Sequence, residues 1–309
     1  MTVAASAAEV FERFEPVVVD VPPGWTMNWL GVKTRAEIQS NSGAASGPIR
    51  IAFDRPSLSE DFFEWLDVLE SVVESSGTYT IVELGAGWGR WLVNAAAAVR
   101  RYDPQRRFLL VGVEGEPTHF EWLRRHLADN GIDPGEHVLV RAAVAARDGR
   151  VRFEQGDAAA WYGQAIPPDD PQAKLAGPVS RLLRWGRNTA ANRAVRGPAA
   201  RKVRRVRAVS LATVLRTLDR VDLMDVDIQG AEAAVFATAA EELTAKVARV
   251  HVGTHGAENE ARVRSLFGAL GWECRFDYPG GREVETPWGP VTFEDGAQSW
   301  LNPALRASA

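Results

Sequence analysis

Short apolar runs alternate with helix-length segments through most of this chain, and this alternation restricts its fold more than any other feature. The runs predict strands at residues 80–84, 108–113, 137–142, 223–227 and 247–253. The segments between them predict helices, and a further helix is expected from residue 59, before the first strand. Strands joined through helices form right-handed βαβ units. The sequence therefore predicts an α/β fold with a mainly parallel sheet, to which a turn-rich tail from Glu273 adds antiparallel edge strands.

Two regions interrupt this alternation and define the expected domain organisation. Residues 1–57 lack a sustained period and predict an irregular N-terminal cap, and residues 58–309 form the main domain. Residues 157–208 stand where a short connection would suffice, and loops of this length are commonly functional. We interpret them as an insertion above the carboxyl ends of the strands, in which residues 182–187 and 199–206 could be helical.

Composition excludes several classes of protein. With 46% apolar and 25% charged residues, the chain is neither disordered nor fibrous. Its one cysteine, Cys274, excludes an intrachain disulfide and a cysteine-built zinc cluster. The first residues lack the basic start of a signal peptide. The sequence contains no apolar stretch of about 18 residues, the length needed to span a membrane. We therefore expect a cytoplasmic protein.

Charge is unevenly distributed along the chain. Nine arginines and one lysine fall within residues 181–207, which contain no acid, whereas the whole chain has a net charge of −4. The remainder must therefore carry a charge of −14, so a polyanion is not expected to cover the whole surface. A local basic site in the insertion remains open.

A glycine-rich turn follows the first predicted strand, at Gly85, Gly87 and Gly89. In an open α/β sheet this turn is where a nucleoside binds. The spacing differs from the dinucleotide pattern, and no phosphate-binding Gly-Lys-Ser/Thr ending is present. Instead Glu83 precedes the first glycine, which suits a ligand with a cationic amino-acid end. Glu114 ends the next strand, where it either accepts ribose hydroxyl groups or faces solvent.

Several segments in this order resemble class I S-adenosylmethionine-dependent methyltransferases, and more narrowly the FkbM family. The resemblance spans residues 81–303 and rests on Glu83-Leu-Gly-Ala-Gly87, Val113-Glu114, Ala142-Ala-Val-Ala-Ala-Arg-Asp-Gly149, Trp161-Tyr-Gly-Gln164, Ser210-Leu-Ala-Thr-Val-Leu215, Asp225-Val-Asp-Ile-Gln-Gly-Ala-Glu232 and Gln298-Ser-Trp-Leu-Asn-Pro303. It implies a Rossmann-like fold with a mainly parallel seven-stranded sheet, an antiparallel C-terminal edge and an inserted lid. It also implies S-adenosylmethionine as cofactor and O-methylation of a hydroxyl group as the reaction.

The resemblance also implies a set of cofactor-binding residues. The methionine end would be bordered by Glu83, Gly85, Ala86 and Gly87, the ribose would be held by Glu114, and the adenine would lie beside Ala143. The family pattern Lys-Ile-Asp-Val-Glu-Gly is altered at two places. Asp225 stands at the lysine position and Gln229 at the glutamate position, whereas Asp227 and Glu232 are retained.

Methylation of an alcohol requires alignment of the acceptor and removal of its proton. His255, which follows the fifth predicted strand, is the expected base, and Asp227 would orient it or hold the acceptor hydroxyl. A divalent cation such as Mg²⁺ could alternatively be held by Asp227 and Glu232, with Asp225 as a third ligand. We favour metal-free catalysis, with Glu232 at the start of its helix as a capping or pairing acid. His119, close to Glu114 and Glu116, could approach the adenosine, but a position on the helix surface is favoured.

Trp161, Tyr162 and Gln164 mark the start of the insertion. They suit contacts with a sugar or ring substrate, or alternatively they anchor the insertion to the domain. The favoured partner is a small-molecule or glycan hydroxyl acceptor, such as a sugar, glycoside or polyketide-type compound. Two alternatives are a nucleic-acid methyltransferase that uses the arginine-rich segment and a non-catalytic S-adenosylmethionine-binding module. Neither the acceptor nor the oligomeric state can be read from the sequence.

Overall fold

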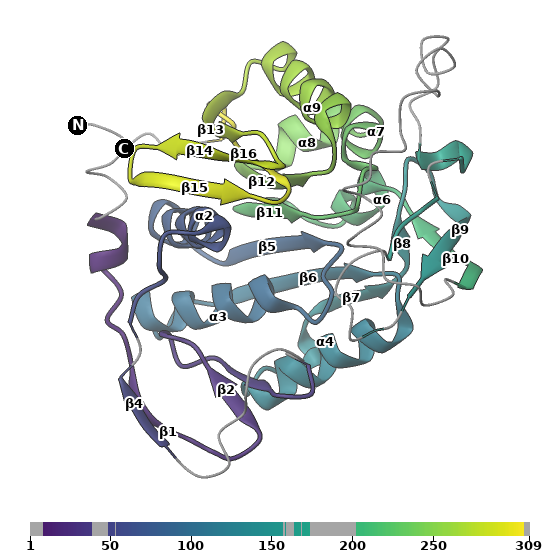
Figure 1. Cartoon of the computed structure of the whole chain (residues 1–309). Helices are drawn as coiled ribbons and strands as arrows, with labels where there is room; N and C mark the ends of the chain where they lie inside the picture. The colour runs from purple at the N-terminus through teal and green to yellow at the C-terminus, as the bar shows by residue number, and fades with distance from the viewer. Residues whose placement is uncertain are drawn as a thin grey trace.

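The computed structural model describes residues 9–38, 49–52, 54–156, 158, 164–167, 169–173 and 202–305. Within these residues the centre of the fold is a seven-stranded sheet (Figure 1). From one edge to the other its strands are β13 (Glu273–Tyr278), β16 (Gly296–Leu301), β12 (Arg249–Thr254), β11 (Leu223–Val226), β5 (Tyr79–Leu84), β6 (Phe108–Glu114) and β7 (Val138–Arg141).

The strand directions confirm the predicted mainly parallel sheet. β12, β11, β5, β6 and β7 pair in parallel, whereas β16 is antiparallel to both of its neighbours, β12 and β13. The antiparallel strand therefore lies one position in from the C-terminal edge. Because the five parallel strands end on the same side, the turns that follow them gather at one edge of the sheet.

Helices cover both faces of this sheet (Figure 1). They are α2 (Glu60–Glu74), α3 (Arg90–Tyr102), α4 (Pro117–Asp129), α6 (Leu211–Leu215), α7 (Glu232–Ala237), α8 (Ala240–Lys246) and α9 (Ala257–Ala269). Successive strand residues point to opposite faces. In β5, for example, Ile81 packs with α2 and α3 in one apolar core, and Val82 packs with α6 to α9 in the other.

The N-terminal region is more regular than the sequence indicates. The described part of it contains two antiparallel pairs, β1 (Val18–Val21) with β4 (Ile49–Ala52) and β2 (Trp25–Met27) with β3 (Lys33–Arg35). Strands of three or four residues are too short to produce a readable period. The region shares the core of the main domain, since Trp29 packs edge-on against Trp65 at 5.3 Å between ring centroids.

A smaller sheet stands beside the carboxyl edge. It consists of β8 (Ala143–Val144), β10 (Lys202–Val209) and β9 (Gly149–Gln155), with β10 in the middle. The helix expected at residues 199–206 is therefore wrong from residue 202 onward, because β10 pairs antiparallel with β9, Val206 opposite Val151. Residues 174–201, which hold most of the basic segment, lie outside the described residues.

The remaining described elements are two 3-10 turns and a hairpin. The turns are η1 (Pro134–Glu136) and η2 (Pro171–Ala173), and the hairpin is formed by β14 (Arg282–Thr286) and β15 (Gly289–Phe293). The hairpin precedes β16, so the turn between β15 and β16 reaches the carboxyl edge of the sheet. In the part of the chain that the structure describes, no helix has the length and apolar character needed to cross a membrane.

Candidate functional site

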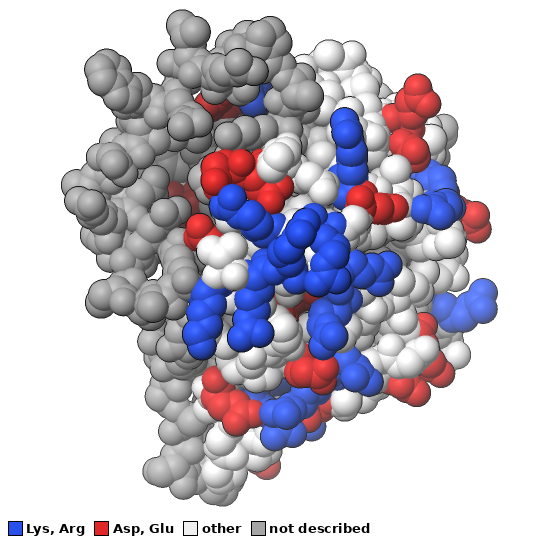
Figure 2. All heavy atoms as spheres, turned by 90° about the vertical axis from the view of Figure 1, so that its right-hand side faces the viewer, with Lys and Arg blue, Asp and Glu red and all other residues white. Residues whose placement is uncertain are grey.

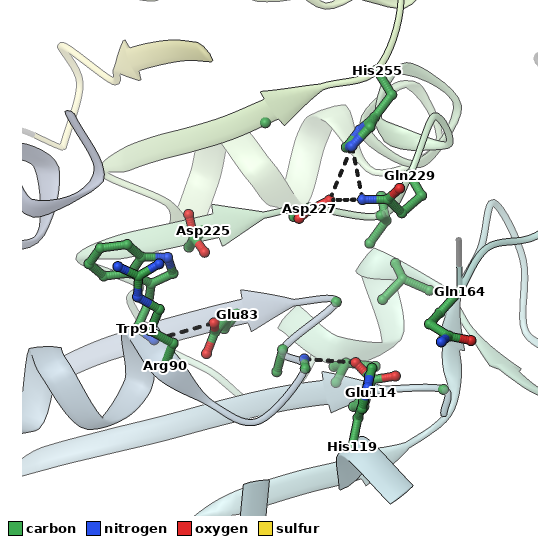
Figure 3. A pocket seen from close by; sticks show the side chains of 18 of the residues that line it. Glu83, Arg90, Trp91, Glu114, His119, Gln164, Asp225, Asp227, Gln229 and His255 are labelled. Atoms are coloured by element: carbon green, nitrogen blue, oxygen red, sulfur yellow. Dashed lines mark hydrogen bonds and ion pairs between the residues drawn. The ribbon is translucent and has the colours of Figure 1, made fainter. Parts of the chain in front are cut away.

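A cavity of about 660 Å³ opens at the carboxyl ends of the parallel strands (Figure 3). Most of the residues singled out in the sequence line it: Glu83, Gly85, Ala86, Gly87, Glu114, Ala143, Gln164, Asp227 and His255. Glu232 lies fully buried behind His255. Trp161 and Tyr162 lie outside the described residues. The structure thus brings together in one cavity segments that are far apart in the sequence.

The glycine turn is shaped by close contacts with neighbouring elements. Gly85 has a φ of +82°, and a Cβ atom at this position would lie 1.9 Å from the carbonyl oxygen of Asp227. Gly89 has a φ of +74°, and a Cβ atom there would lie 2.2 Å from Cδ1 of Leu123. Only glycine meets both requirements, a left-handed backbone and the absence of a side chain.

Glu83 is buried beneath this turn. Its carboxylate accepts hydrogen bonds from the backbone N–H groups of Trp91 (3.4 Å) and Leu92 (3.2 Å), in the first turn of α3. Burial, together with the neighbouring carboxylates of Asp225 and Glu64, raises the pKa of Glu83 well above its usual range. Glu83 therefore supplies the acceptor that the start of α3 lacks on its own residues.

Glu114 joins the glycine turn to the loop after β6. Its Oε2 accepts from the N–H of Gly87 at 2.7 Å, and its Oε1 accepts from the N–H of Glu116 at 2.6 Å. The residue is only 6% exposed, so the alternative that it faces solvent is wrong. Burial raises its pKa. The carboxylate nevertheless borders the cavity, where it can accept from a ligand hydroxyl.

His119 also lines the cavity, contrary to the expected helix-surface position. It is 3% exposed, and its Nε2 lies 2.9 Å from the carbonyl oxygen of Ala158. The reason is local: α4 begins at Pro117, directly after β6, so its first turn faces the cavity rather than solvent.

His255 stands at the end of β12 within a group of polar side chains (Figure 3). Its Nδ1 lies 3.0 Å from Oε1 of Glu232. Its Nε2 lies 2.9 Å from Nε2 of Gln229, 3.5 Å from Oδ1 of Asp227 and 3.4 Å from Oδ2 of Asp295. Burial opposes the charged ring, but the hydrogen bonds to Asp295 and Glu232 outweigh it and raise the pKa of His255 well above 6.5.

The contacts of Gln229 bear on the protonation of this ring. The Gln229 amide nitrogen donates to Oδ1 of Asp227 at 2.8 Å and also approaches Nε2 of His255. An amide N–H can be accepted only by a ring nitrogen without a proton, so this contact fits neutral His255 whose Nδ1–H donates to Glu232. Asp295 favours the protonated ring instead. The group can therefore accommodate His255 before and after it takes up a proton.

Glu232, the first residue of α7, has contacts of the kind that the capping or pairing interpretation expects. It accepts from the N–H of Gly230 at 3.0 Å and from Nδ2 of Asn259 at 2.5 Å, in addition to its contact with His255. Ligand atoms of Asp227, Glu232 and His255 all lie within 4.8 Å of one another, which would also permit a cation. Asp225 does not join this set, because it lies with Glu64 and His251.

The opposite, inner end of the cavity is acidic. Figure 3 shows Asp225 toward Glu83 and Arg90, apart from the group around His255. Glu64 of α2 lines the same end, and burial beside these carboxylates raises its pKa to about 8. Sequence reasoning did not identify Glu64 or Asp295. Both come from elements outside the strand-to-helix turns, so no local motif marks them.

Similarity to known proteins extends over more than half of this chain. The family profile described as "Methyltransferase FkbM domain" matches residues 83–278, more than half of the chain. A protein of Jannaschia sp. (strain CCS1), named "Putative methyltransferase", is 29% identical over 276 residues, which are 86% of this chain and 88% of that protein.

Two solved structures are also similar to this chain. Methyltransferase FkbM from Methylobacillus flagellatus KT is 8% identical, with a TM-score of 0.44 and coverage of 80% of this chain and 56% of that chain. Precorrin 8W decarboxylase from Methanobacterium thermoautotrophicum is 12% identical, with a TM-score of 0.40 and coverage of 80% of this chain and 92% of that chain.

Proposed function

This chain belongs to the FkbM family of methyltransferases, and from that premise we propose that it transfers a methyl group from S-adenosylmethionine to a hydroxyl group of a small molecule or glycan. Methyltransferase activity and use of S-adenosylmethionine follow from the family and the fold. The hydroxyl acceptor is the proposed part. It is carried by one observation: a histidine held by a buried carboxylate stands in the same cavity as the glycine turn.

The cavity fits the cofactor in size and in chemistry. About 660 Å³ is within the usual range for small-molecule sites. No atom lies within 4 Å of the Cβ position of Gly87, which leaves space for a ligand to approach the backbone closely, and Glu114 offers a carboxylate acceptor for the ribose hydroxyl groups. Ala143 is buried, lines the cavity and would border the adenine. We assign the methionine end to the turn from Glu83 to Gly87.

S-adenosylmethionine, when bound, supplies a methyl group on a positively charged sulfur, which leaves as a neutral thioether. His255 would take the proton of the acceptor hydroxyl group on its Nε2, which makes the hydroxyl oxygen more nucleophilic. Glu232 fixes Nδ1 and stabilises the imidazolium that forms, in the way that a buried acid supports histidine in hydrolases. Asp227, whose Oδ1 lies 3.5 Å from Nε2 of His255, would hold the acceptor hydroxyl near the ring.

Gln164 is the described member of the proposed substrate group. It lines the cavity, and its Oε1 accepts from the N–H of Gly156 at 2.8 Å. This bond holds Gln164 against the point where the chain leaves β9, and Gln164 lines the same cavity as His255. We propose that the acceptor enters here, with Trp161 and Tyr162 as further contacts.

The test begins with calorimetric titration of S-adenosylmethionine, followed by assay of S-adenosylhomocysteine release against glycosides, sugars and hydroxylated polyketides. We expect one-site binding and transfer to oxygen, identified by mass spectrometry of the product. His255→Ala should lower kcat at least 100-fold with cofactor affinity retained. His137→Gln, outside the cavity, is the matched control. Wild-type rates in His255→Ala would refute the assigned base, and binding without transfer would favour a non-catalytic module.

One surface feature favours a second candidate, a nucleic-acid methyltransferase. Figure 2 shows Lys and Arg side chains gathered on the face that carries β9 and β10. Arg150 lies opposite Arg207 and Arg152 opposite Arg205, and all four are exposed. Like charges directly opposite each other destabilise a strand pair, so an anionic partner would relieve this repulsion.

RNA and DNA oligomers, titrated at about 50 mM and about 200 mM salt, distinguish the two candidates. A phosphate-binding face should lose affinity steeply with salt, and Arg150→Gln together with Arg207→Gln should reduce the slope. We expect no such salt-dependent binding.

A further inference from the structure

A row of polar side chains crosses the centre of the sheet, beneath α2. The register places Glu83 of β5 beside Asp225 of β11, Asp225 beside His251 of β12, and His251 beside Ser299 of β16. Each of these residues is at most 6% exposed. Buried parallel strands are normally apolar on both faces, so this row requires an explanation.

Most charges near the row have partners of opposite sign. Arg249 pairs with Asp67 (2.6 Å), Glu70 (2.7 Å) and Glu74 (3.0 Å). Arg90 pairs with Asp61. Of these two arginines, Arg90 lines the cavity and its charge also acts on Glu64 and Glu83.

Two carboxylates at this end remain unpaired. Among the residues that the structure describes, neither Asp225 nor Glu64 has a direct hydrogen bond or ion pair through its side chain, although the charge of Arg90 acts on both and that of His251 acts on Glu64. Asp225 is only 6% exposed, and its carboxylate borders the cavity (Figure 3). An isolated buried carboxylate is costly, so such a group either takes up a proton, as the raised pKa of Asp225 and of Glu64 indicates, or binds a positively charged ligand.

His251 has the arrangement of a metal-binding histidine. Its Nδ1 lies 2.7 Å from Oδ2 of Asp67, and Asp67 is itself held by Arg249 and by the hydroxyl of Ser299 at 2.7 Å. Histidines that ligate metals usually donate their second ring N–H to a carboxylate, which fixes the ring and its tautomer. Here that bond leaves Nε2 as the atom available to a ligand.

We propose that Glu64, Asp225 and His251 bind a divalent transition-metal ion. Each offers a ligand atom, and these atoms lie within 4.8 Å of one another. One imidazole and two carboxylates suit ions such as Mn²⁺ or Zn²⁺ better than Mg²⁺ or Ca²⁺, which prefer oxygen ligands alone. The ion would link α2 to β11 and β12 and neutralise the inner end of the cavity. An ion at this position would leave His255 free to act as a base. It is therefore a different site from the one considered above for a cation at Asp227 and Glu232.

Binding of Mn²⁺ to the full-length chain, first cleared of metal with a chelator, tests this proposal. Calorimetry should give one ion per chain, and electron spin echo spectroscopy should detect one coupled imidazole nitrogen. Asp225→Asn and Glu64→Gln should each weaken binding at least tenfold. Asp227→Asn, in the other acidic group, is the matched control and should retain affinity. Circular dichroism and thermal unfolding establish that each variant is folded.

Three outcomes would overturn the proposal: no stoichiometric Mn²⁺ in the wild type, no nitrogen coupling, or loss of binding in Asp227→Asn with retention in Asp225→Asn. Because cofactor binding is measured separately, failure of the metal site leaves the proposed methyltransferase reaction intact.

Discussion

Gly85 packs directly against the backbone of Asp227, where a Cβ atom on residue 85 would lie 1.9 Å from the Asp227 carbonyl oxygen. Gly85→Ala must therefore push the glycine turn away from the end of β11. We expect a loss of about 3 kcal/mol in the free energy of unfolding, since it combines left-handed strain with a backbone clash. Urea denaturation monitored by tryptophan fluorescence measures this change.

Gly87 provides the matched control for that substitution. Its φ of +52° is also left-handed, but no atom lies within 4 Å of the position of its Cβ. Gly87→Ala should cost only about 1 kcal/mol. Equal losses in the two variants would mean that the contact with Asp227 relaxes without cost.

The pH dependence of methyl transfer should follow His255. A general base acts in its neutral form, so the rate rises with pH through the pKa of His255, which the hydrogen bonds to Asp295 and Glu232 raise well above 6.5 despite burial. Glu232→Gln removes one of these charges and should move the midpoint of kcat/KM against pH to lower pH. Glu241→Gln, on α8 away from the site, is the control and should leave the midpoint of kcat/KM against pH unchanged.

The same shift has a consequence for stability. The folded-state pKa of His255 lies above the unfolded value, so its charge stabilises the fold fully below about pH 6.5. This contribution is lost as the pH rises through the folded-state pKa. Thermal unfolding of wild type and His255→Gln should therefore differ more at pH 6 than at pH 10, and a pH-independent difference would contradict the assignment of the charge.

Gln229 stands where the family pattern has glutamate, and it donates to Asp227 at 2.8 Å. Gln229→Glu would remove this donor and add a carboxylate beside Nε2 of His255. We expect a further rise in the pKa of His255, so the pH–rate profile should move to higher pH and activity at neutral pH should fall. NMR titration of the His255 ring measures the pKa directly, and a decrease would exclude this account of Gln229.

The sequence predicts the central fold well because each strand and helix there is specified by local residues. The five parallel strands lie within two residues of their predicted limits. Residues 202–206 were wrongly expected to be helical, because their strand conformation depends on pairing with β9. The short N-terminal strands were not predicted for the same reason, because strands of three or four residues form only by pairing with a partner strand.

Some residues of the candidate site could be predicted from local sequence, and others could not. Glu83, Glu114, Asp227 and His255 each lie at or just after the end of a strand, so the topology of a parallel sheet places them in one cavity. Asp295 reaches His255 from the turn between β15 and β16, and Glu64 reaches the inner end from α2. Neither contact follows from local sequence. The separation of Asp225 from Asp227 also required the structure, because alternation alone permits both on one face.

Glu114 should contribute to cofactor affinity through its charge and through the position of the turn. In Glu114→Gln an NH₂ group replaces one of the two accepting oxygens. The side chain can then accept from the N–H of Gly87 or of Glu116 with its remaining oxygen, but the NH₂ group cannot accept from the other. We expect a loss of at least about tenfold in the affinity for S-adenosylhomocysteine, as for a hydrogen bond to a charged group. Glu121→Gln, exposed on α4, should leave calorimetric affinity unchanged. An unchanged Kd in Glu114→Gln would remove Glu114 from the proposed ribose site.

Arg249 should be the cation whose loss costs the fold most. It is 2% exposed and pairs with Asp67, Glu70 and Glu74. Arg249→Met removes this shared counter-charge, and Asp67 then keeps only its contact with His251 and Glu70 its ion pair with Arg275. Breaking a buried pair in this way typically costs about 3–5 kcal/mol. Arg152→Met, which removes the exposed pair with Asp169, should cost less than about 1 kcal/mol. Urea denaturation near pH 7 compares the two, and a similar small loss in both would mean that Asp67 and Glu70 are neutralised without Arg249.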